Sequence, residues 1–291
     1  MYQECRFGNN VTFEESQKNF RPNLSDYYAH PENYRLAPFR IFGNLYYVGD
    51  KKVCCHLIDT GAGLILFDTG YGHETDFLLE NIRTLGFDPK DIRYIIHSHG
   101  HFDHFCGSNA IRAISGATVC MSAVDTQLLR EMPERALMHW SPVPEAPICW
   151  PDRELADGEH IVLGNTDITC VLTPGHTFGT MTFFFHVTDG EKTYRAGYFG
   201  GVGFLTVYKL YCRQYGMPET KCACMAESIR KVWDEQVDIL LGNHPAQNCT
   251  IEKRQWMLDN PGKNPFINPD AWHIFLTALE KRRKEFEELG Y

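Results

Sequence analysis

The stretch that decides the fold of this chain, residues 95–107, reads Ile-Ile-His-Ser-His-Gly-His-Phe-Asp-His-Phe-Cys-Gly. Its core is the pattern His99-x-His101-x-Asp103-His104, which gathers four possible metal ligands into six positions. Imidazole nitrogen and carboxylate oxygen bind divalent metals of borderline softness, with zinc as the first candidate. An apolar segment at residues 92–96 leads into the pattern. The sequence therefore predicts a buried strand that ends in a metal-binding loop.

The spacing of these ligands indicates that one short loop could serve two metals. Side chains two positions apart on an extended chain point the same way, so His99 and His101 are expected to face one point. Asp103 and His104 would then face a neighbouring point. The alternative is a polar loop that is rich in histidine by composition alone, and the fixed spacing after an apolar strand argues against it. His97 precedes the pattern and is expected to be packed in the interior or to support a ligand.

The pattern resembles the His-x-His-x-Asp-His signature of the metallo-β-lactamase superfamily. Further segments, spread over residues 37–285, also resemble parts of that family. They are Thr-Pro-Gly-His-Thr at 173–177, which would supply His176, Leu-Leu-Gly-Asn-His-Pro at 240–245, which would supply His244, and Leu-Ile-Leu-Phe-Asp-Thr-Gly at 64–70, which would lead to Asp68.

The resemblance implies an α/β protein with the four-layer αββα metallo-β-lactamase sandwich. The alternation of expected strands and helices by itself predicts only a layered α/β arrangement. We expect a single domain of this fold over residues 37–291. Residues 1–36 are polar and aromatic without a clear period, and they are expected to form an N-terminal extension. This arm could pack across the active-site face, mediate self-association, or simply lie on the surface.

The resemblance also implies two zinc ions per chain, although another divalent metal would fit the same ligand types. One metal would be held by three histidines and the other by an aspartate and two histidines: His99, His101 and His176, then Asp103, His104 and His244. Asp103 is in addition the expected catalytic proton acceptor. Asp68 is expected to orient ligands without touching a metal.

One departure from the family pattern indicates a subgroup. Many hydrolases of the family place a bridging aspartate in the stretch that corresponds to residues 196–203, and this chain has no carboxylate there. Together with His244, this makes the chain most similar to the third, His-rich subclass of true metallo-β-lactamases. Where those enzymes usually have Asp-Ser, this chain has Gly200-Gly201, which predicts a roomier and more apolar pocket at that point.

Two segments are expected to form the walls of a substrate pocket, because the metal geometry is common to the family and selectivity must come from elsewhere. Residues 132–151 carry five prolines together with Trp140 and Trp150, and residues 200–221 are rich in glycine and tyrosine. A surface loop is the alternative for the first segment. The individual candidates for substrate contact are Trp140, Trp150, Tyr198 and Arg213.

Composition limits the partners. The net charge of −9 argues against nucleic acid, which needs a basic stripe, and against an anionic membrane surface. No apolar run is long enough for a membrane-spanning helix. The polar start of the chain and an odd count of 11 cysteines predict a cytoplasmic protein with reduced thiols. A small molecule is the expected partner, and the sequence leaves the oligomeric state open.

The function that the resemblance implies is hydrolysis of an amide, lactam or ester bond by a metal-bound hydroxide, with β-lactamase-like activity as its sharpest form. A cytoplasmic lactonase or esterase with little lactam activity is the first alternative. A metal-binding module with weak catalysis is the second. The complete set of ligand types argues against the second alternative, because a decayed site tends to lose ligands.

Overall fold

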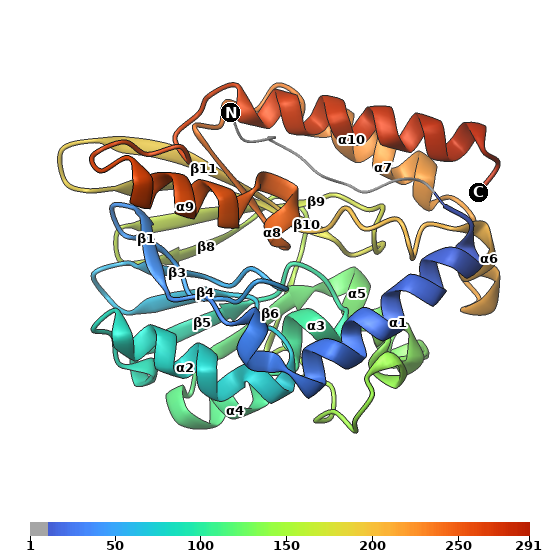
Figure 1. The fold of residues 1–291 in the computed structure, drawn as a ribbon, viewed down its shortest axis with the longest axis horizontal. Helices are drawn as coiled ribbons and strands as arrows, with labels where there is room; N and C mark the ends of the chain where they lie inside the picture. Colours follow the sequence, from blue (N-terminus) through green and yellow to red (C-terminus); the bar gives the residue numbers. More distant parts are fainter. Residues whose placement is uncertain (1–10) are drawn as a thin grey trace.

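The structure is a computed structural model, and it describes residues 11–291, apart from the side chain of Arg21. Two β-sheets form its centre (Figure 1). The first sheet has seven strands in sequential order: β1 (Phe39–Phe42), β2 (Leu45–Tyr47), β3 (His56–Asp59), β4 (Leu64–Phe67), β5 (Ile92–Ile96), β6 (Thr118–Ser122) and β7 (Arg153–Leu155). Strands β1 to β4 are antiparallel, and β4 to β7 run parallel to one another.

The second sheet has five strands in the order β12-β11-β10-β9-β8. Only β11 and β12 are parallel neighbours within it. Its strands are β8 (Glu159–Leu163), β9 (Thr166–Leu172), β10 (Met181–Thr188), β11 (Thr193–Phe199) and β12 (Ile239–Gly242). In the first sheet, β5 coincides with residues 92–96, which the sequence predicts as a buried strand, because an apolar run before a polar loop is a local signal.

Helices cover the outer face of each sheet, which confirms the αββα sandwich (Figure 1). Helices α2, α4 and α5 pack on the first sheet, and α7 and α10 pack on the second. The helices are α1 (Phe13–Ala29), α2 (Thr75–Thr84), α3 (Phe102–Phe105), α4 (Ser108–Ser115), α5 (Ala123–Glu131), α6 (Lys209–Gln214), α7 (Lys221–Lys231), α8 (Pro245–Asn248), α9 (Thr250–Asp259) and α10 (Ala271–Glu288). Among the described residues, no helix has both the length and the apolar content that a bilayer crossing requires.

The apolar run in β4 shows why both sheets can be covered on two sides. Ile65 and Phe67 face the second sheet, where Phe67 packs on Phe183 at 5.1 Å between ring centroids. Leu64 and Leu66 face the helices. A strand buried on both faces must be apolar at every position, and this is the pattern that its sequence showed.

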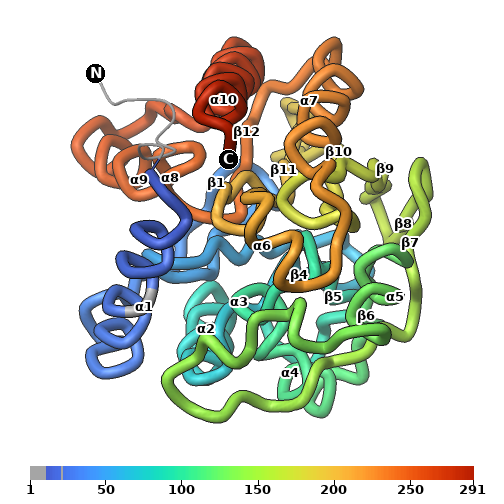
Figure 2. Tube along the Cα trace, turned by 90° about the vertical axis from the view of Figure 1, so that its right-hand side faces the viewer, coloured from blue at the N-terminus to red at the C-terminus, as the bar shows by residue number. Residues whose placement is uncertain are grey.

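Helix α1 corrects the expectation of an arm without periodic pattern. Its N-terminus carries a capping box, in which Thr12 and Glu15 bond each other's backbone N–H groups. Phe20, Leu24 and Tyr27 recur at helical spacing, and Leu24 and Tyr27 are buried against the domain. Pro22 inside the helix removes one backbone donor and hides this period in the sequence. Figure 2 shows α1 lying along the side of the molecule.

Candidate metal centre and pocket

The possible metal ligands converge where several strands end. His99, His101, Asp103 and His104 follow β5, His176 lies between β9 and β10, and His244 follows β12. Because β4 and β5 are parallel, the end of β4 delivers Asp68 to the same edge of the sheet. Open α/β sheets bind ligands at this edge, beyond the carboxyl ends of the strands.

Three histidines form the first group. His176 Nε2 lies 3.1 Å from His99 Nε2 and 3.0 Å from His101 Nδ1. All three side chains are buried. His99 Nδ1 donates to the carbonyl oxygen of Gly200 at 2.8 Å, and His176 Nδ1 donates to that of Gly203 at 2.7 Å. In each of these two rings the Nδ1–H group therefore bonds a backbone carbonyl, and Nε2 carries the lone pair.

The lone pairs that remain on His99 and His176 face each other. Burial, together with the neighbouring rings of His104 and His176, keeps the pKa of His99 well below 6.5, and burial lowers the pKa of His176 to about 3. Both rings are therefore neutral at physiological pH, and neither Nε2 atom has a proton to share. Two lone pairs 3.1 Å apart repel each other unless a cation lies between them.

The second group combines a carboxylate with two histidines. Asp103 Oδ2 lies 3.3 Å from His104 Nε2 and 3.6 Å from His244 Nε2. His244 Nδ1 donates to the carbonyl oxygen of Lys52 at 2.7 Å, so its Nε2 is the free nitrogen. His104 Nε2 is buried and has no hydrogen-bond partner within residues 11–291. A buried nitrogen of this kind is costly unless it binds a ligand.

Asp68 holds His104 in place through a fully buried network. Its carboxylate accepts from the backbone N–H of Ser98 at 2.7 Å, from Ser98 Oγ at 2.7 Å, from His104 Nδ1 at 2.8 Å and from Tyr198 Oη at 2.6 Å. Asp68 also has a positive φ of 54°, which places the carboxylate under the ligand loop. Asp68 thus lies behind His104 and bonds its Nδ1, and the supporting role toward a metal stays a prediction. His97, also predicted to be packed, is buried beside Ser108 Oγ.

The charge balance of the second group favours a cation. Burial alone would lower the pKa of His104, but Asp103 and Asp68 outweigh burial and raise it to about 10. For Asp103, burial would raise the pKa, but His104 and His244 hold it below its ordinary value. The buried Asp68 carboxylate and the partly buried Asp103 carboxylate therefore favour positive charge at this point, which a metal ion could supply in place of the proton on His104.

Two buried charged residues that the sequence reasoning missed connect the ligand loops. The Asp125 carboxylate accepts from the backbone N–H groups of Gly100 and Gly179 and from Thr177 Oγ1, each at 2.8 Å, and so joins the loops on either side of His101 and His176. Lys221 Nζ donates to the His176 carbonyl oxygen at 3.2 Å. The only local signal for Asp125 was its position after a cap residue, Ser122, at a helix start.

The glycines after β11 do not widen the pocket, contrary to expectation. A Cβ on Gly200 would lie 2.1 Å from the Met181 carbonyl oxygen, and one on Gly201 would lie 2.7 Å from His176 Cδ2. The space that these side chains would fill is already occupied by backbone and by the His176 ring. The glycines thus allow a close approach to a ligand ring, and only Gly203 of the run lines the pocket.

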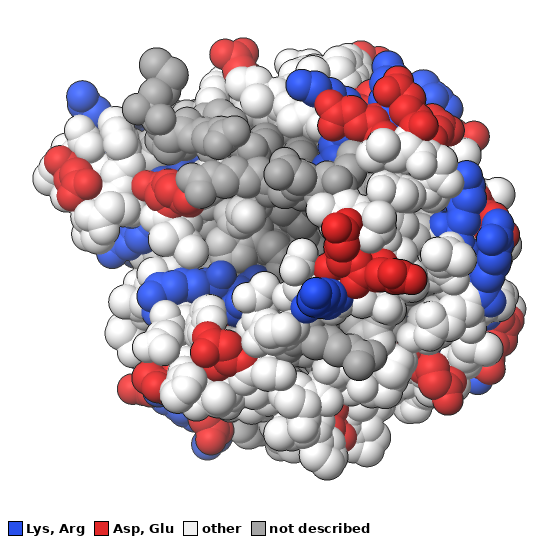
Figure 3. Space-filling view, turned by 45° about the vertical axis from the view of Figure 1, so that its right-hand side comes forward, with Lys and Arg blue, Asp and Glu red and all other residues white. Residues whose placement is uncertain are grey.

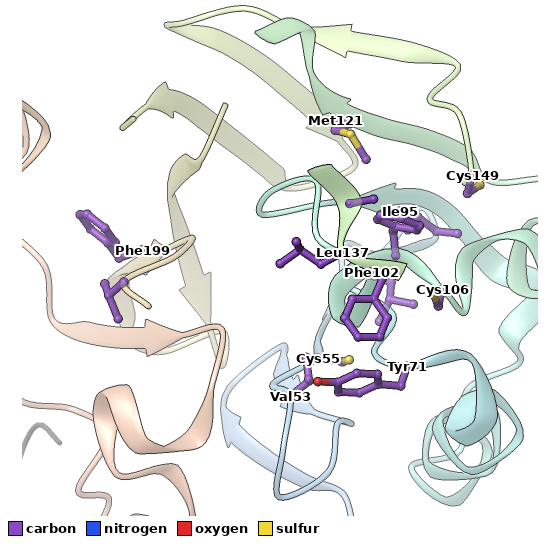
Figure 4. Packing of buried hydrophobic residues seen from close by; sticks show 14 of the residues in the cluster. Val53, Cys55, Tyr71, Ile95, Phe102, Cys106, Met121, Leu137, Cys149 and Phe199 are labelled. Carbon is purple, nitrogen blue, oxygen red and sulfur yellow. The ribbon is translucent and has the colours of Figure 1, made fainter. Parts of the chain in front are cut away.

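A cavity of about 440 Å³ opens at His101, Asp103, His176 and His244. Trp140 lines it, as predicted, together with residues from the segment 200–221. Leu137, Phe102 and Tyr71 also line it, and they lie near one another in the apolar core, with the Phe102 and Tyr71 rings 5.2 Å apart (Figure 4).

The other three candidates for substrate contact are corrected by the structure. Tyr198 is fully buried, and its hydroxyl is used by Asp68. Arg213 is exposed and forms an ion pair with Glu219 at 2.7 Å, outside the cavity. Trp150 is 39% exposed and lies under the guanidinium of Arg130, again away from the cavity. The identity of an aromatic or basic residue in an irregular loop does not predict where its side chain points.

Comparisons with known proteins agree with this geometry. Residues 48–189 match the family model described as "Metallo-beta-lactamase superfamily". Among solved structures, BJP-1, a subclass B3 metallo-beta-lactamase of Bradyrhizobium japonicum, is 28% identical with a TM-score of 0.75, covering 87% of this chain and 94% of that one. The FEZ-1 metallo-beta-lactamase from Legionella gormanii is 28% identical with a TM-score of 0.76, covering 87% of this chain and 98% of that one.

Curated relatives match over a shorter range. The N-acyl homoserine lactonase of Bacillus thuringiensis is 27% identical over 157 residues, which is 45% of this chain and 57% of the lactonase. The hydroxyacylglutathione hydrolase of Rhodospirillum rubrum is 26% identical over 110 residues, 36% of each protein. The chain thus spans little more than half the length of the lactonases that it matches. Residues 48–189 form a metallo-beta-lactamase superfamily domain, and the structural neighbours of the chain include subclass B3 metallo-beta-lactamases.

Proposed function

We propose that this protein is a dinuclear zinc hydrolase that cleaves an amide, lactam or ester bond. His99, His101 and His176 would hold one zinc ion, and Asp103, His104 and His244 would hold the other. The observation that carries the proposal is the pair of facing lone pairs on His99 and His176, 3.1 Å apart, beside the buried His104 Nε2 and the Asp103 carboxylate 3.3 Å from it. Three protein ligands per metal leave a position open, as catalytic sites require.

Bound zinc would supply a water molecule of lowered pKa and would polarise the carbonyl group that is attacked. The protein itself would contribute an ionised side chain placed beside the metals and an apolar cavity lining. Asp103 is the only acidic residue among the described residues that line the cavity, and its carboxylate stays ionised because His104 and His244 oppose the effect of burial. It can therefore accept a proton at Oδ2 and hold the attacking water. Phe102, Leu137 and Trp140 keep the remaining solvent away from the reacting bond.

A lactam is the substrate that the comparisons favour over a lactone. The subclass B3 neighbours match over 87% of the chain, whereas the lactonases match over 45%. In addition, β11 is followed by Gly200, whose carbonyl oxygen accepts from His99 and Asn243, and residues 196–203 contain no carboxylate that could bridge two metals. A lactonase or general esterase remains the second candidate because of the curated relatives.

The proposed partner is a small molecule, and the predictions of a cytoplasmic location and of no nucleic-acid partner remain predictions. On the face shown in Figure 3, acidic and basic side chains are interspersed, and most of the described surface is neither. This distribution is what an enzyme for small substrates needs, because binding energy is concentrated in the cavity.

A hydrolysis screen with a metal-reversal step tests the proposal. Zinc-loaded protein is expected to hydrolyse at least one of a panel of penicillins, cephalosporins, N-acyl lactones and aryl esters, to lose that activity in a chelator, and to regain it on addition of zinc. His101→Ala should lose activity and zinc together. His160→Ala is the matched control, since the His160 side chain is exposed and, among the described residues, bonds only Asp167. Bound zinc without turnover of any substrate would instead favour the metal-binding module.

A further inference from the structure

The cavity above the ligand groups has a wall that lies outside the matched family region. Residues 48–189 match the family model, but Phe20 and Leu24 of α1 line the cavity. The cavity is also lined by Trp140 from the proline-rich segment and by Phe204 and Tyr208 from the segment before α6. This apolar chamber continues from the side chains that would hold the metals, so a molecule bound at the metals extends into it.

Helix α1 is fixed to two separate segments around the cavity, residues 132–151 and residues 200–221. Phe20 packs edge-on against Trp140 with ring centroids 5.3 Å apart, and Phe13 packs against Tyr208 at 5.2 Å. On the far end of the helix, the Tyr28 hydroxyl donates to Glu145, which also accepts from Ser141 Oγ at 2.8 Å. The apolar face of α1 is therefore held in position by contacts at both ends of the helix.

Lys52 places positive charge at the metal end of the same cavity. It lines the cavity, and its backbone carbonyl oxygen accepts from His244 Nδ1, which sets the Lys52 backbone directly beside that ligand. Its ammonium lies 4.4 Å from the centroid of the Tyr34 ring and makes no ion pair within 4.0 Å with any described carboxylate. The neighbouring Asp50 is already engaged, because it accepts from the Tyr27 hydroxyl and from the backbone N–H groups of Lys52 and Val53.

We propose that this cavity selects an anionic substrate with an apolar substituent: Lys52 contacts the carboxylate, and Phe20 with Trp140 contacts the alkyl or aryl group. The inference rests on the proposed hydrolase for turnover, but the binding it describes can be measured without turnover. An ammonium contributes a charge-assisted hydrogen bond to a carboxylate, and a rigid aromatic wall contributes buried apolar area. Arg282 is the second basic residue that lines the cavity, where it lies over the Phe204 ring at 4.8 Å, and Lys52 is preferred because its backbone carbonyl bonds the ligand His244.

Equilibrium binding of octanoate and 1-octanol to zinc-loaded protein, measured by calorimetry, tests the proposal. We expect Lys52→Met to weaken octanoate binding about tenfold or more and to leave octanol binding unchanged, and Lys52→Arg to restore most of the loss. Phe20→Ala should weaken both ligands about fivefold to tenfold. Lys18→Ala is the control, because Lys18 is exposed on α1 and does not line the cavity. Lys18→Ala should change neither the octanoate affinity nor the octanol affinity.

Kinetics give an independent readout and separate the two proposals. For a hydrolysable carboxylate and its methyl ester, Lys52→Met should raise KM for the carboxylate about tenfold, leave kcat within about twofold, and leave both constants for the ester unchanged. An unchanged octanoate affinity in Lys52→Met, or a loss that appears in Arg282→Gln instead, would overturn the assignment. If wild-type protein hydrolyses nothing in the panel, the proposed function fails, while the octanoate measurement still decides the role of Lys52.

Discussion

Replacing Asp103 with asparagine is expected to lower kcat/KM by a factor of about 10²–10⁴ while the protein remains folded. Asparagine has nearly the same shape, but it carries no charge and its nitrogen donates a hydrogen bond. The group 3.3 Å from His104 Nε2 would then neither accept a proton nor balance the charge of a metal. The fold should survive because Asp103, in the short helix α3 beyond β5, is not part of the two apolar cores.

The measurement for Asp103→Asn is steady-state kinetics on the best substrate of the panel, with a thermal unfolding scan beside it. Asp125→Asn is a useful comparison, because that buried carboxylate joins the ligand loops without lining the metal group. A variant at Asp103 that keeps most of the wild-type kcat/KM would place the chemistry elsewhere in the molecule.

Asp68→Asn is expected to weaken metal binding by about 10- to 100-fold and to lower the free energy of unfolding by about 3 kcal/mol. Asparagine tolerates the positive φ of 54° at this position, so the change tests charge and hydrogen bonding without adding backbone strain. It leaves one oxygen where two oxygens now accept from Ser98, His104 and Tyr198. The amide nitrogen would also face donors.

Tyr198→Phe is the matched control for Asp68→Asn, because it removes a single 2.6 Å hydrogen bond from the same network. It should lower the free energy of unfolding by about 1 kcal/mol and leave metal affinity within a few-fold.

The direction in which pH changes the stability contributed by Asp68 follows from its pKa. Burial raises the pKa of Asp68, but His104 outweighs it, and the pKa falls below its ordinary 3.8. Stabilisation by Asp68 is therefore complete above about pH 4 and is lost at lower pH. If Asp68→Asn and Tyr198→Phe had equal effects on metal affinity, the result would contradict the supporting role of Asp68.

The ligand loops and their strands were predictable because their signals are local. The pattern from His99 to His104 follows its strand directly, and the apolar run of β4 leads straight to Asp68. In each case the sequence specifies a strand end, and parallel pairing of β4 with β5 brings those ends together. The structure thus places close together in space residues that, from the sequence, could be assigned to one site only through a family resemblance.

The walls of the cavity and the supporting contacts were not predictable from local patterns. Helix α1 depends on tertiary burial of Leu24 and Tyr27, and Pro22 interrupts its propensity. Asp125 bonds a residue 25 positions earlier and another 52 positions later, which no spacing rule anticipates. Trp150 and Arg213 have suitable chemistry for substrate contact, but their directions are set by Arg130 and Glu219, their local partners.

Metal content measured on purified protein tests the central claim most directly. Elemental analysis of wild-type protein, purified without chelator and dialysed against zinc, should give about two zinc ions per chain. His244→Ala removes a ligand from the second group alone and should lower the content to about one, with His176 and its two partners still bound to metal. If wild-type protein held only one zinc ion per chain, and His244→Ala held the same amount, the result would contradict the dinuclear centre.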